Sequence, residues 1–211
     1  MMGTRFPVSD MLRVMARSDD QLLDETKRGG ADAFGALFER HADAVYNFCF
    51  RRTGDWSVAE DLTAVVFLEG WRHRQTVVLD GRDSLLPWLL GVATNVLRNQ
   101  RRSVRRNRRA LERIGAERAT QDFADDAAGR LSDAARVREL LPLFEALPQR
   151  ERDVLGLCVL GDLDYEQAAL ALGIPGGTVR SRLSRAKARL RELDAARPVV
   201  AQSLPPINDG V

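Results

Sequence analysis

The residues with the clearest chemistry lie between Gly173 and Leu190. Five cations occur there with no acidic residue among them, namely Arg180, Arg182, Arg185, Lys187 and Arg189. Such groups pair with phosphates, and an arginine can also donate two hydrogen bonds to one guanine. The charge alone is weak support for that chemistry, because most charged helix faces are simply solvated. The surrounding elements therefore have to be considered.

The helical period separates this stretch into two faces. Over residues 178–191 it places four apolar side chains on one stripe: Val179, Leu183, Ala186 and Leu190. The opposite face carries Ser181, Ser184, Arg185 and Ala188. We therefore expect a helix that buries one side and presents a small, polar and cationic side to its surroundings.

A second helix is predicted immediately before it. A helix over 151–160, with apolar positions Val154, Leu155, Leu157 and Val159, breaks at Gly161-Asp162. Asp164 and Gln167 form a capping box for the helix 165–172, and Gly173 suits a left-handed C-terminus. This is a helix-turn-helix, whose second helix lies in the DNA major groove when the unit binds DNA. Such units also occur in proteins that do not touch DNA.

The charge of the whole chain is balanced but segregated. There are 32 basic and 30 acidic residues, a formal net charge of +2, so the chain does not coat nucleic acid indiscriminately. A second basic block comprises Arg98, Arg101, Arg102, Arg105, Arg106, Arg108 and Arg109. Acidic residues follow it at Asp122, Asp125, Asp126 and Asp133.

Several functional classes are disfavoured. Cys49 and Cys158 lie in apolar surroundings without a second ligand at metal spacing, so they are predicted core thiols and no metal site is expected. The sequence has no phosphate-binding glycine loop and no nucleophile elbow, and we expect no cofactor and no enzyme activity. His41 is expected on a helix flank and His73 at the surface. No signal peptide or membrane span is recognised, which predicts a cytoplasmic protein.

The predicted fold is all-α, with two small helical domains joined by a flexible linker, the C-terminal one a helix-turn-helix. Helices are expected over 32–52, from Ser57 as N-cap to Trp71, over 85–105 and over 134–147, with a loop over 75–83. Candidate core residues of the first helix are Phe34, Leu37, Phe38, Val45, Phe48 and Cys49. The expected segments are a flexible N-terminus 1–24, a domain 25–109, an acidic linker 110–133, a domain 134–194 and a flexible tail 195–211.

Four stretches resemble a known family. They are SVAEDLTAVVFLEGW, PWLLGVATNVLRNQRR, LPQRERDVLGL and DLDYEQAALALGIPGGTVRSRLSRAKARL. In this order they are similar to sigma factors of bacterial RNA polymerase. The shortness of the chain matches the extracytoplasmic-function (ECF) group, which keeps only the second and fourth sigma domains.

The resemblance implies a binding function. Such a factor binds core RNA polymerase, places it on promoter DNA and assists promoter opening. An anti-sigma factor is left open as a further partner. The C-terminal domain would recognise the minus-thirty-five element through Thr178, Arg180, Ser181, Arg182, Ser184, Arg185 and Arg189. The N-terminal domain would recognise the minus-ten element through Trp88, Asn95, Arg98, Arg101, Arg102 and Arg105. Trp88 could stack on a base, although its four-residue spacing with Val92 and Val96 favours a core role.

The polymerase would be contacted by the helix after Ser57, through Asp61, Thr63, Ala64, Val65 and Phe67. Here the chain departs from the family, whose common DLTQEVF is replaced by Asp61-Leu62-Thr63-Ala64-Val65-Val66-Phe67. A second departure is Leu90-Gly91, where the family often carries Tyr-Arg. Gly91 lacks that cation and costs about 1 kcal/mol of helix propensity.

Two alternatives stay open at this point. The aspartates of the linker could imitate phosphates in a basic polymerase channel, or the linker could be a plain solvated tether. A stand-alone helix-turn-helix regulator would explain residues 173–190, but it leaves the N-terminal domain and its arginines without a task.

Overall fold

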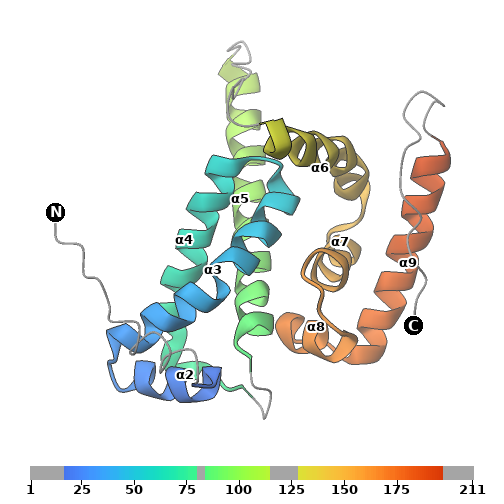
Figure 1. The fold of residues 1–211 in the computed structure, drawn as a ribbon. Coiled ribbons are helices and arrows are strands. Elements are labelled where there is room, and N and C mark those ends of the chain that lie inside the picture. Colours follow the sequence, from blue (N-terminus) through green and yellow to red (C-terminus); the bar gives the residue numbers. More distant parts are fainter. Residues whose placement is uncertain (1–16, 80–83, 115–127, 197–211) are drawn as a thin grey trace.

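The structure is a computed structural model that describes residues 17–79, 84–114 and 128–196. Within these ranges every regular element is a helix (Figure 1). The N-terminal module contains α2 (Asp19–Lys27), α3 (Ala31–Thr53), α4 (Trp56–His73), a 3-10 turn η1 (Arg74–Thr76) and α5 (Leu86–Ile114). The C-terminal module contains α6 (Ala128–Ala146), α7 (Gln149–Leu155), a π-helical turn η2 (Gly156–Leu160), α8 (Tyr165–Leu172) and α9 (Gly176–Ala195). The predicted all-α fold is confirmed for the described residues.

The N-terminal module is built on α3, α4 and α5, which pack on one another. Its core includes Leu37, Val45, Phe48, Leu62, Val66, Leu89 and Leu97. The predicted end of α3 is confirmed, because Gly54 adopts a left-handed conformation with φ 67°. Phe38 was expected in this core but is 43% exposed, and its ring contacts that of Phe67 with 4.7 Å between the centroids.

The start of α4 differs from the prediction. The N-cap is Asp55 and not Ser57, because the Asp55 carboxylate accepts a hydrogen bond of 2.9 Å from the Val58 backbone N–H. Ser57 is already the second residue of the helix. A carboxylate at the N-cap satisfies a backbone donor that has no partner inside the helix.

A buried aspartate ties three parts of the N-terminal module together. The sequence suggested a flexible segment up to residue 24, but Ser18 caps α2 and Asp19 is 1% exposed. The Asp19 carboxylate accepts hydrogen bonds from His41 Nε2 (2.6 Å), Arg40 Nη1 (2.5 Å) and the Leu85 backbone N–H (2.6 Å). His41 is therefore buried and not on a helix flank. Asp19 joins α2 to α3 and fixes the chain where it enters α5.

These contacts set the ionisation of Asp19. Burial alone would raise its pKa, but the hydrogen bonds from His41, Leu85 and Arg40 and the charge of His41 prevail. They lower the pKa of Asp19 from 3.8 to about 2. The carboxylate therefore stabilises the fold at neutral pH.

The helix-turn-helix was predicted closely. The capping box of Asp164 and Gln167 is present, and Gly173 ends α8 with φ 63°. Val179, Leu183 and Ala186 of α9 are buried and Leu190 is half-buried, as the helical period indicated. Val159 differs, with 49% exposure, because the π-helical turn changes the direction of the side chains within it.

The flanking helices extend into the predicted linker 110–133. Helix α5 continues to Ile114 and α6 begins at Ala128. The acidic residues Asp122, Asp125 and Asp126, the N-terminus 1–16 and the tail 197–211 lie outside the described residues. Predictions about them are neither confirmed nor contradicted.

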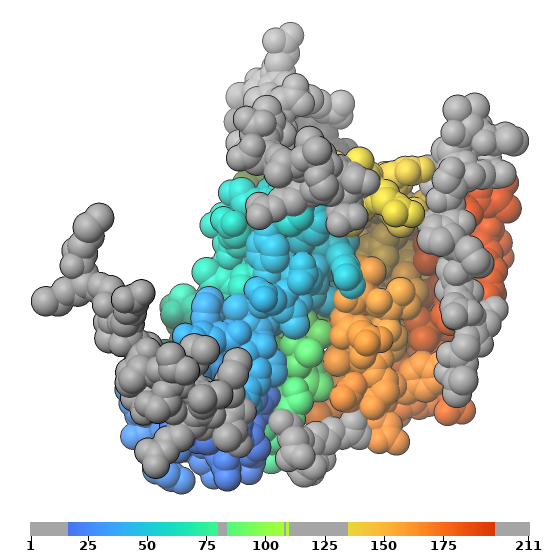
Figure 2. Space-filling model, viewed as in Figure 1, coloured from blue at the N-terminus to red at the C-terminus, as the bar shows by residue number. Residues whose placement is uncertain are grey.

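The two modules, which the sequence predicted as domains joined by a flexible linker, pack against each other in the structure. Helix α5 contacts α8, and α3 contacts both η2 and α6. Figure 1 shows α5 between the other N-terminal helices and the C-terminal module, and in the space-filling view the surfaces of α3 and of α6 to α8 meet (Figure 2). The described part of the chain therefore forms one continuous body.

Both cysteines have the expected core character. Cys49 is buried, Cys158 is half-buried and neither forms a disulfide. Burial raises the pKa of Cys49 to about 12 and that of Cys158 to about 11, the latter with help from the charge of Asp164. Both thiols are thus protonated at neutral pH and are poor nucleophiles.

The Asp19 cluster predicts a pH-dependent contribution to stability. Asp19→Asn should lower the free energy of unfolding at pH 7 by about 2 kcal/mol, the value of a pKa held nearly two units below that of the unfolded chain. Because a depressed carboxylate pKa stabilises only above the unfolded value, the difference from wild type should shrink below about pH 4 and fall to roughly half near pH 3.

Urea unfolding of both chains between pH 7 and pH 3 measures this difference. Asp20→Asn is the matched control, since Asp20 is the exposed neighbour in the same helical turn. Equal stabilities of Asp19→Asn and Asp20→Asn at pH 7 would contradict the assignment.

Candidate nucleic-acid and polymerase interfaces

The outward face of α9 is the first candidate surface. Arg180, Ser181, Ser184 and Arg185 are exposed, and so are Ala188 and Arg189. Thr178 and Arg182 are half-buried at its edge. The structure thus brings together the residues proposed for the minus-thirty-five element on one helix, and the buried stripe of α9 fixes which side faces outward.

Local contacts hold this face in order. The Ser181 hydroxyl donates to the Thr178 carbonyl (3.1 Å), and Arg185 Nε donates to the Ser181 carbonyl (3.2 Å). The Arg180 guanidinium lies 5.7 Å from the centroid of the Tyr165 ring at the start of α8. Arg189 Nε lies 3.5 Å from the buried carboxylate of Glu151 in α7. The Arg185 and Arg180 side chains keep further donors that face solvent.

A basic hollow adjoins the same face. A cavity of about 420 Å³ lies between the start of α7 and the start of α9, and its charged lining residues are three arginines, Arg150, Arg182 and Arg185, and one carboxylate, Glu151. A helix that enters a major groove brings the neighbouring helix to the DNA backbone. The position and charge of this hollow suit a phosphate strand beside the bases that α9 would contact.

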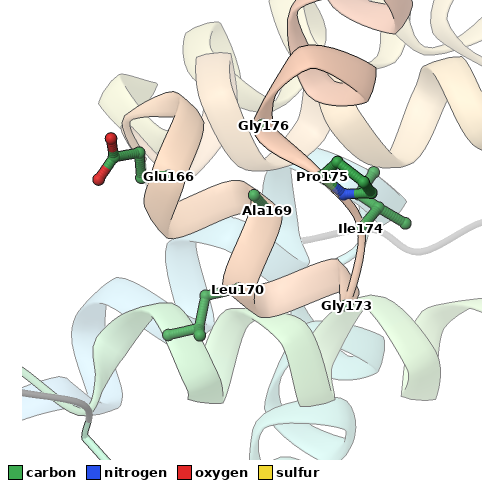
Figure 3. A pocket seen from close by; sticks show the side chains of 7 residues that line it. All are labelled: Glu166, Ala169, Leu170, Gly173, Ile174, Pro175 and Gly176. Atoms are coloured by element: carbon green, nitrogen blue, oxygen red, sulfur yellow. The ribbon is translucent and has the colours of Figure 1, made fainter.

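A second, larger hollow has a different character. It has a volume of about 570 Å³, and Figure 3 shows it at the turn between α8 and α9, with Leu170, Ile174 and Pro175 on its wall. Its only charged lining residue is Glu166. An apolar wall with one carboxylate does not attract phosphates, so we assign no nucleic-acid contact to this hollow.

The basic block on α5 is the second candidate surface. Asn95, Arg102 and Arg105 are exposed, as are Arg106 and Arg109 further along the helix. Trp88 is half-buried and packs against the hydrophobic core. The Asn95 side-chain oxygen accepts a hydrogen bond from Arg98 Nη1 (3.0 Å). Part of the block is therefore available to an anionic ligand.

Two arginines of this block are instead paired with the C-terminal module. Arg98 donates to Asp153 Oδ2 from Nε (3.0 Å) and from Nη2 (2.7 Å), a charge-assisted pair across the modules. Arg101 Nη2 donates to Glu145 Oε1 (3.0 Å). Asp153 belongs to α7 and is 1% exposed, and Glu145 lies at the end of α6. Two of the four arginines proposed for the minus-ten element thus face carboxylates of their own chain.

Asp153 also faces a buried cation of α3. Arg52 Nη2 lies 3.6 Å from Asp153 Oδ1, and both side chains are 1% exposed. The guanidinium lies 4.9 Å from the Phe144 ring centroid and 5.5 Å from that of Phe48. Arg52 Nε and Nη1 have no hydrogen-bond partner. Burial lowers the pKa of Arg52 to about 10 although Asp153 opposes this, so the residue stays charged at neutral pH.

The outward face of α4 is the third candidate surface, and its centre is apolar. Asp61, Ala64, Val65 and Leu68 are exposed, and the exposed Phe38 of α3 contacts Phe67 of the same helix. Thr63 and Phe67, which the sequence also assigned to this surface, are buried. The Thr63 hydroxyl donates to the Ala59 carbonyl within α4 (2.7 Å). Two of the five assigned residues therefore hold the helix in the module.

Sequence reasoning missed several residues of these surfaces. Leu68 follows Val65 by three residues and Asp61 by seven, so the helical period could have found it. Arg52, Glu145 and Asp153 gave no such signal, because Arg52 and Asp153 are 101 positions apart in the chain. Their pairing depends on how the modules pack.

Two kinds of site are not seen in the described ranges. Residues 17–79, 84–114 and 128–196 contain no group of three or more possible metal ligands. None of the helices in those ranges combines the length and the apolarity that a membrane span requires.

Comparison with known families agrees with this geometry. The family model of Sigma-70 region 2 matches residues 37–109, which cover most of α3, α4 and the basic part of α5. The model of Sigma-70, region 4 matches residues 138–190, which cover the end of α6 and the helix-turn-helix. The two regions occur in the order that the resemblance implied.

Curated relatives match over most of their own length. The ECF RNA polymerase sigma factor BldN of Streptomyces coelicolor is 30% identical over 192 residues, which cover 89% of this chain and 69% of BldN. The RNA polymerase sigma factor CarQ of Myxococcus xanthus is 30% identical, and the aligned region covers 94% of CarQ. The ECF RNA polymerase sigma factor SigL of Mycobacterium tuberculosis is 33% identical, and the aligned region covers 85% of SigL and 74% of this chain.

Two solved structures share the fold. CnrH, in complex with the cytosolic domain of CnrY, superimposes with a TM-score of 0.60 at 23% identity and matches 86% of this chain and 100% of CnrH. The sigma factor RpoE of Bartonella quintana, in complex with the anti-sigma factor NepR, gives a TM-score of 0.56 at 23% identity over 78% of this chain. From the two sigma-70 regions and from the extent of its similarity to BldN, CarQ and SigL, we conclude that the chain belongs to the extracytoplasmic-function sigma factors of bacterial RNA polymerase.

Proposed function

We propose that the chain directs core RNA polymerase to a specific set of promoters through three separate surfaces, and that it works in the cytoplasm by binding and not by catalysis. The observation that carries the proposal is the exposed face of α9, where two serines and two arginines stand opposite a buried stripe. Purified chain and core polymerase, tested on DNA upstream of the genes that its expression induces, should give promoter-dependent transcription. A stand-alone regulator would instead bind DNA tightly without polymerase.

The α9 face is suited to the minus-thirty-five element. Ser181, Ser184 and Arg185 point to the same side and are short or flexible enough to reach base edges in a major groove. Thr178, Arg180, Arg182 and Arg189 surround them and are placed to hold phosphates. This division assigns sequence recognition to the centre of the face and affinity to its rim.

The α5 surface is suited to the minus-ten element. Asn95 is exposed beside Arg98 and can donate and accept hydrogen bonds with a base. Arg98, Arg101, Arg102 and Arg105 would then track the backbone of the displaced strand. Because Trp88 packs against the core, we propose that it positions α5 and does not stack on a base.

The α4 surface is suited to the polymerase. Asp61, Ala64, Val65 and Leu68 form an exposed face with an apolar centre, next to Phe38. Apolar centres with a charged edge are typical of protein–protein interfaces. The replacement of two polar family positions by Ala64 and Val65 makes this centre more apolar than the family pattern, while Thr63 and Phe67 support it from inside.

Promoter binding requires the modules to separate. The two promoter elements are about 25 base pairs apart by their names, or about 85 Å of B-form DNA at roughly 3.4 Å per base pair. A helix of the length of α9 spans only about 30 Å. Because α5 packs on α8, and α8 packs on α9, we infer that the packed modules do not place their proposed surfaces on both elements at once.

An anti-sigma factor is a further proposed partner. RpoE, which shares the fold of this chain, was solved in complex with the anti-sigma factor NepR. By analogy with that complex, we propose that a comparable protein can hold this chain inactive. Affinity purification of the chain from its own cells, without induction of its promoters, would recover such a partner. If the chain is recovered only together with core polymerase, the proposal of an anti-sigma factor is wrong.

The first prediction concerns the α4 surface. Val65→Asp should weaken binding to core polymerase by about tenfold or more, because it places a carboxylate in the apolar centre of the interface. Biolayer interferometry with immobilised core enzyme measures the dissociation constant. Val159→Asp is the control, since Val159 is a similarly exposed valine on the C-terminal module. Equal affinities of the two variants would place the polymerase contact elsewhere.

The second prediction concerns base recognition by α9. Arg185→Ala should reduce the preference for the matched minus-thirty-five sequence over a scrambled one by about 1–3 kcal/mol, the worth of a bidentate contact. Lys187→Ala, a half-buried cation on the flank of α9, should weaken both sequences equally. Competition binding of holoenzyme to the two DNAs gives both values. A uniform loss for Arg185→Ala would make it a phosphate contact.

The third prediction concerns the α5 track. The double variant Arg102→Gln, Arg105→Gln should reduce the slope of log affinity against log salt for promoter-complex formation by about 1.4, since each contact to a single strand contributes about 0.7. Arg28→Gln, Arg136→Gln removes the same charge from exposed positions on α2's end and on α6 and should leave the slope unchanged. Identical slopes for the two double variants would exclude α5 from the DNA.

A further inference from the structure

The interface between the modules is closely packed at positions where a side chain is absent. At Gly91 of α5, a Cβ atom would lie 2.6 Å from the backbone oxygen of Ala171 in α8. At Gly161, after η2, it would lie 2.8 Å from Leu90 Cδ1 and 3.4 Å from Phe48 Cδ2 of the N-terminal module. The distances to the Ala171 oxygen and to Leu90 Cδ1 are shorter than van der Waals contact. Because the Ala171 oxygen belongs to the backbone, whereas Leu90 Cδ1 is the end of a flexible side chain, the packing of the two modules depends on glycine most strictly at Gly91.

The same interface engages cations that belong to the proposed DNA surface. Arg98 donates to Asp153, and Arg101 donates to Glu145. These hydrogen bonds use guanidinium N–H groups that could otherwise donate to the phosphates of a DNA strand. Arg51 Nη1 donates to the Leu160 carbonyl (3.2 Å), and Arg138 Nε donates to the Gly54 carbonyl (3.1 Å). The C-terminal module is thus held by polar contacts along α3 and α5.

The interface also contains a component that favours opening. Arg52 is fully buried, its pairing with Asp153 is 3.6 Å long, and two of its three nitrogens have no partner. A buried charge with incomplete hydrogen bonding costs free energy that its ion pair only partly returns. Separation of the modules would hydrate this guanidinium and release that cost, so the packing is suited to a reversible contact.

The polymerase surface is free while this interface is formed. The α4 surface of Asp61, Ala64, Val65 and Leu68 is exposed, and within the described residues α4 makes no extensive contact with the helices α6 to α9. In Figure 1, α4 and the C-terminal module lie on opposite sides of α5. Core polymerase could therefore dock on α4 before the modules part.

We propose that the free chain is autoinhibited: the C-terminal module closes on α3 and α5 through the Gly91–Ala171 contact, and Asp153 and Glu145 take the place of DNA phosphates on Arg98 and Arg101. This inference rests on the proposed function of these arginines in binding the minus-ten strand. In the closed form Arg98 and Arg101 are not available to other nucleic acids. When the modules separate to match the spacing of the promoter elements, both arginines become available to DNA. The observed affinity for single-stranded DNA is reduced by the fraction of molecules that are closed.

Gly91→Ala tests the closed form without harming the N-terminal module. Alanine favours helix over glycine, and the three nearest atoms that its Cβ would meet belong to Ala171 of the other module. Gly35→Ala is the matched control, because Gly35 is also inside a helix and a Cβ there meets nothing within 4 Å. Both variants gain the same helix preference, so a difference between them reports on the interface.

The full chain is measured in two ways. Small-angle X-ray scattering should give a larger radius of gyration for Gly91→Ala than for Gly35→Ala and wild type. Fluorescence anisotropy with a mixed-sequence 20-nucleotide single-stranded DNA at low salt should show binding by Gly91→Ala that is about fivefold to tenfold tighter. Equal radii and equal affinities for the three chains would overturn the proposal, and so would a wild-type chain that is already extended.

A second variant covers the case in which Gly91→Ala fails to fold, as judged by circular dichroism. Glu145→Lys acts from the C-terminal module, at an exposed side chain, and replaces the partner of Arg101 with a like charge. It should tighten DNA binding in the same direction, whereas Glu139→Lys, an exposed change of the same charge on α6, should do so much less. Equal effects of the two would reduce the result to net charge and overturn the proposal.

The two levels of the hypothesis fail separately. If Gly91→Ala opens the chain but neither it nor wild type binds core polymerase, the proposed function is wrong and the closed contact remains. If wild type supports promoter-dependent transcription and Gly91→Ala changes neither radius nor DNA affinity, the proposed function remains and autoinhibition is wrong.

Discussion

The arrangement of this chain depends on one carboxylate shared between modules. Asp153 on α7 accepts two hydrogen bonds from Arg98 of α5 and faces Arg52 of α3, and it also accepts one from Gln149 Nε2 within its own helix (2.7 Å). A carboxylate that is 1% exposed would be costly without these partners, and Arg52 would be equally costly without it. Each module therefore carries a charge that the other neutralises. This mutual need selects one relative placement of α3, α5 and α7 among the many that a helical interface would allow.

The remaining interface follows from that placement. Ion pairs across a surface add little when water reaches them, but around Asp153 the helices approach closely enough to exclude water. The approach is possible because Gly91 and Gly161 present backbone where other residues would present a side chain. Gly156 belongs to the same arrangement, since a Cβ there would lie 2.2 Å from Arg52 Nη1. The glycines and the charges thus act together: the glycines set the distance, and the buried ion pair gives the contact its specificity while keeping its net stability modest.

The sequence predicted what local rules control and missed what packing controls. The helix-turn-helix could be placed nearly to the residue, because Asp164, Gln167 and Gly173 are local signals and the stripe from Val179 to Ala186 is regular. The N-cap of α4 was misplaced because Asp55 and Ser57 are both good capping residues, and only the geometry decides between them. The buried state of His41 and the closing of the modules had no local signal. They depend on Asp19 and Asp153, whose partners are tens of residues away. Gly91 departs from the family pattern, and the sequence alone indicates only the loss of a cation there, because its contact with Ala171 of α8 depends on the packing of the modules.

The charge pattern then has a physical explanation that the net charge conceals. A chain with a formal charge of +2 can carry two strongly basic helices only if acidic residues lie elsewhere, and the described structure places two of them, Asp153 and Glu145, against the first basic helix. The second basic helix, α9, keeps its polar face exposed. The two proposed DNA-binding surfaces therefore differ in this structure, one exposed and the other partly paired with carboxylates. Under the proposed autoinhibition, Arg98 and Arg101 exchange carboxylates for phosphates when the modules part, so opening costs less than it would if these arginines gained no new anionic partner. The same residues would then both withhold this surface from DNA and prepare it for DNA.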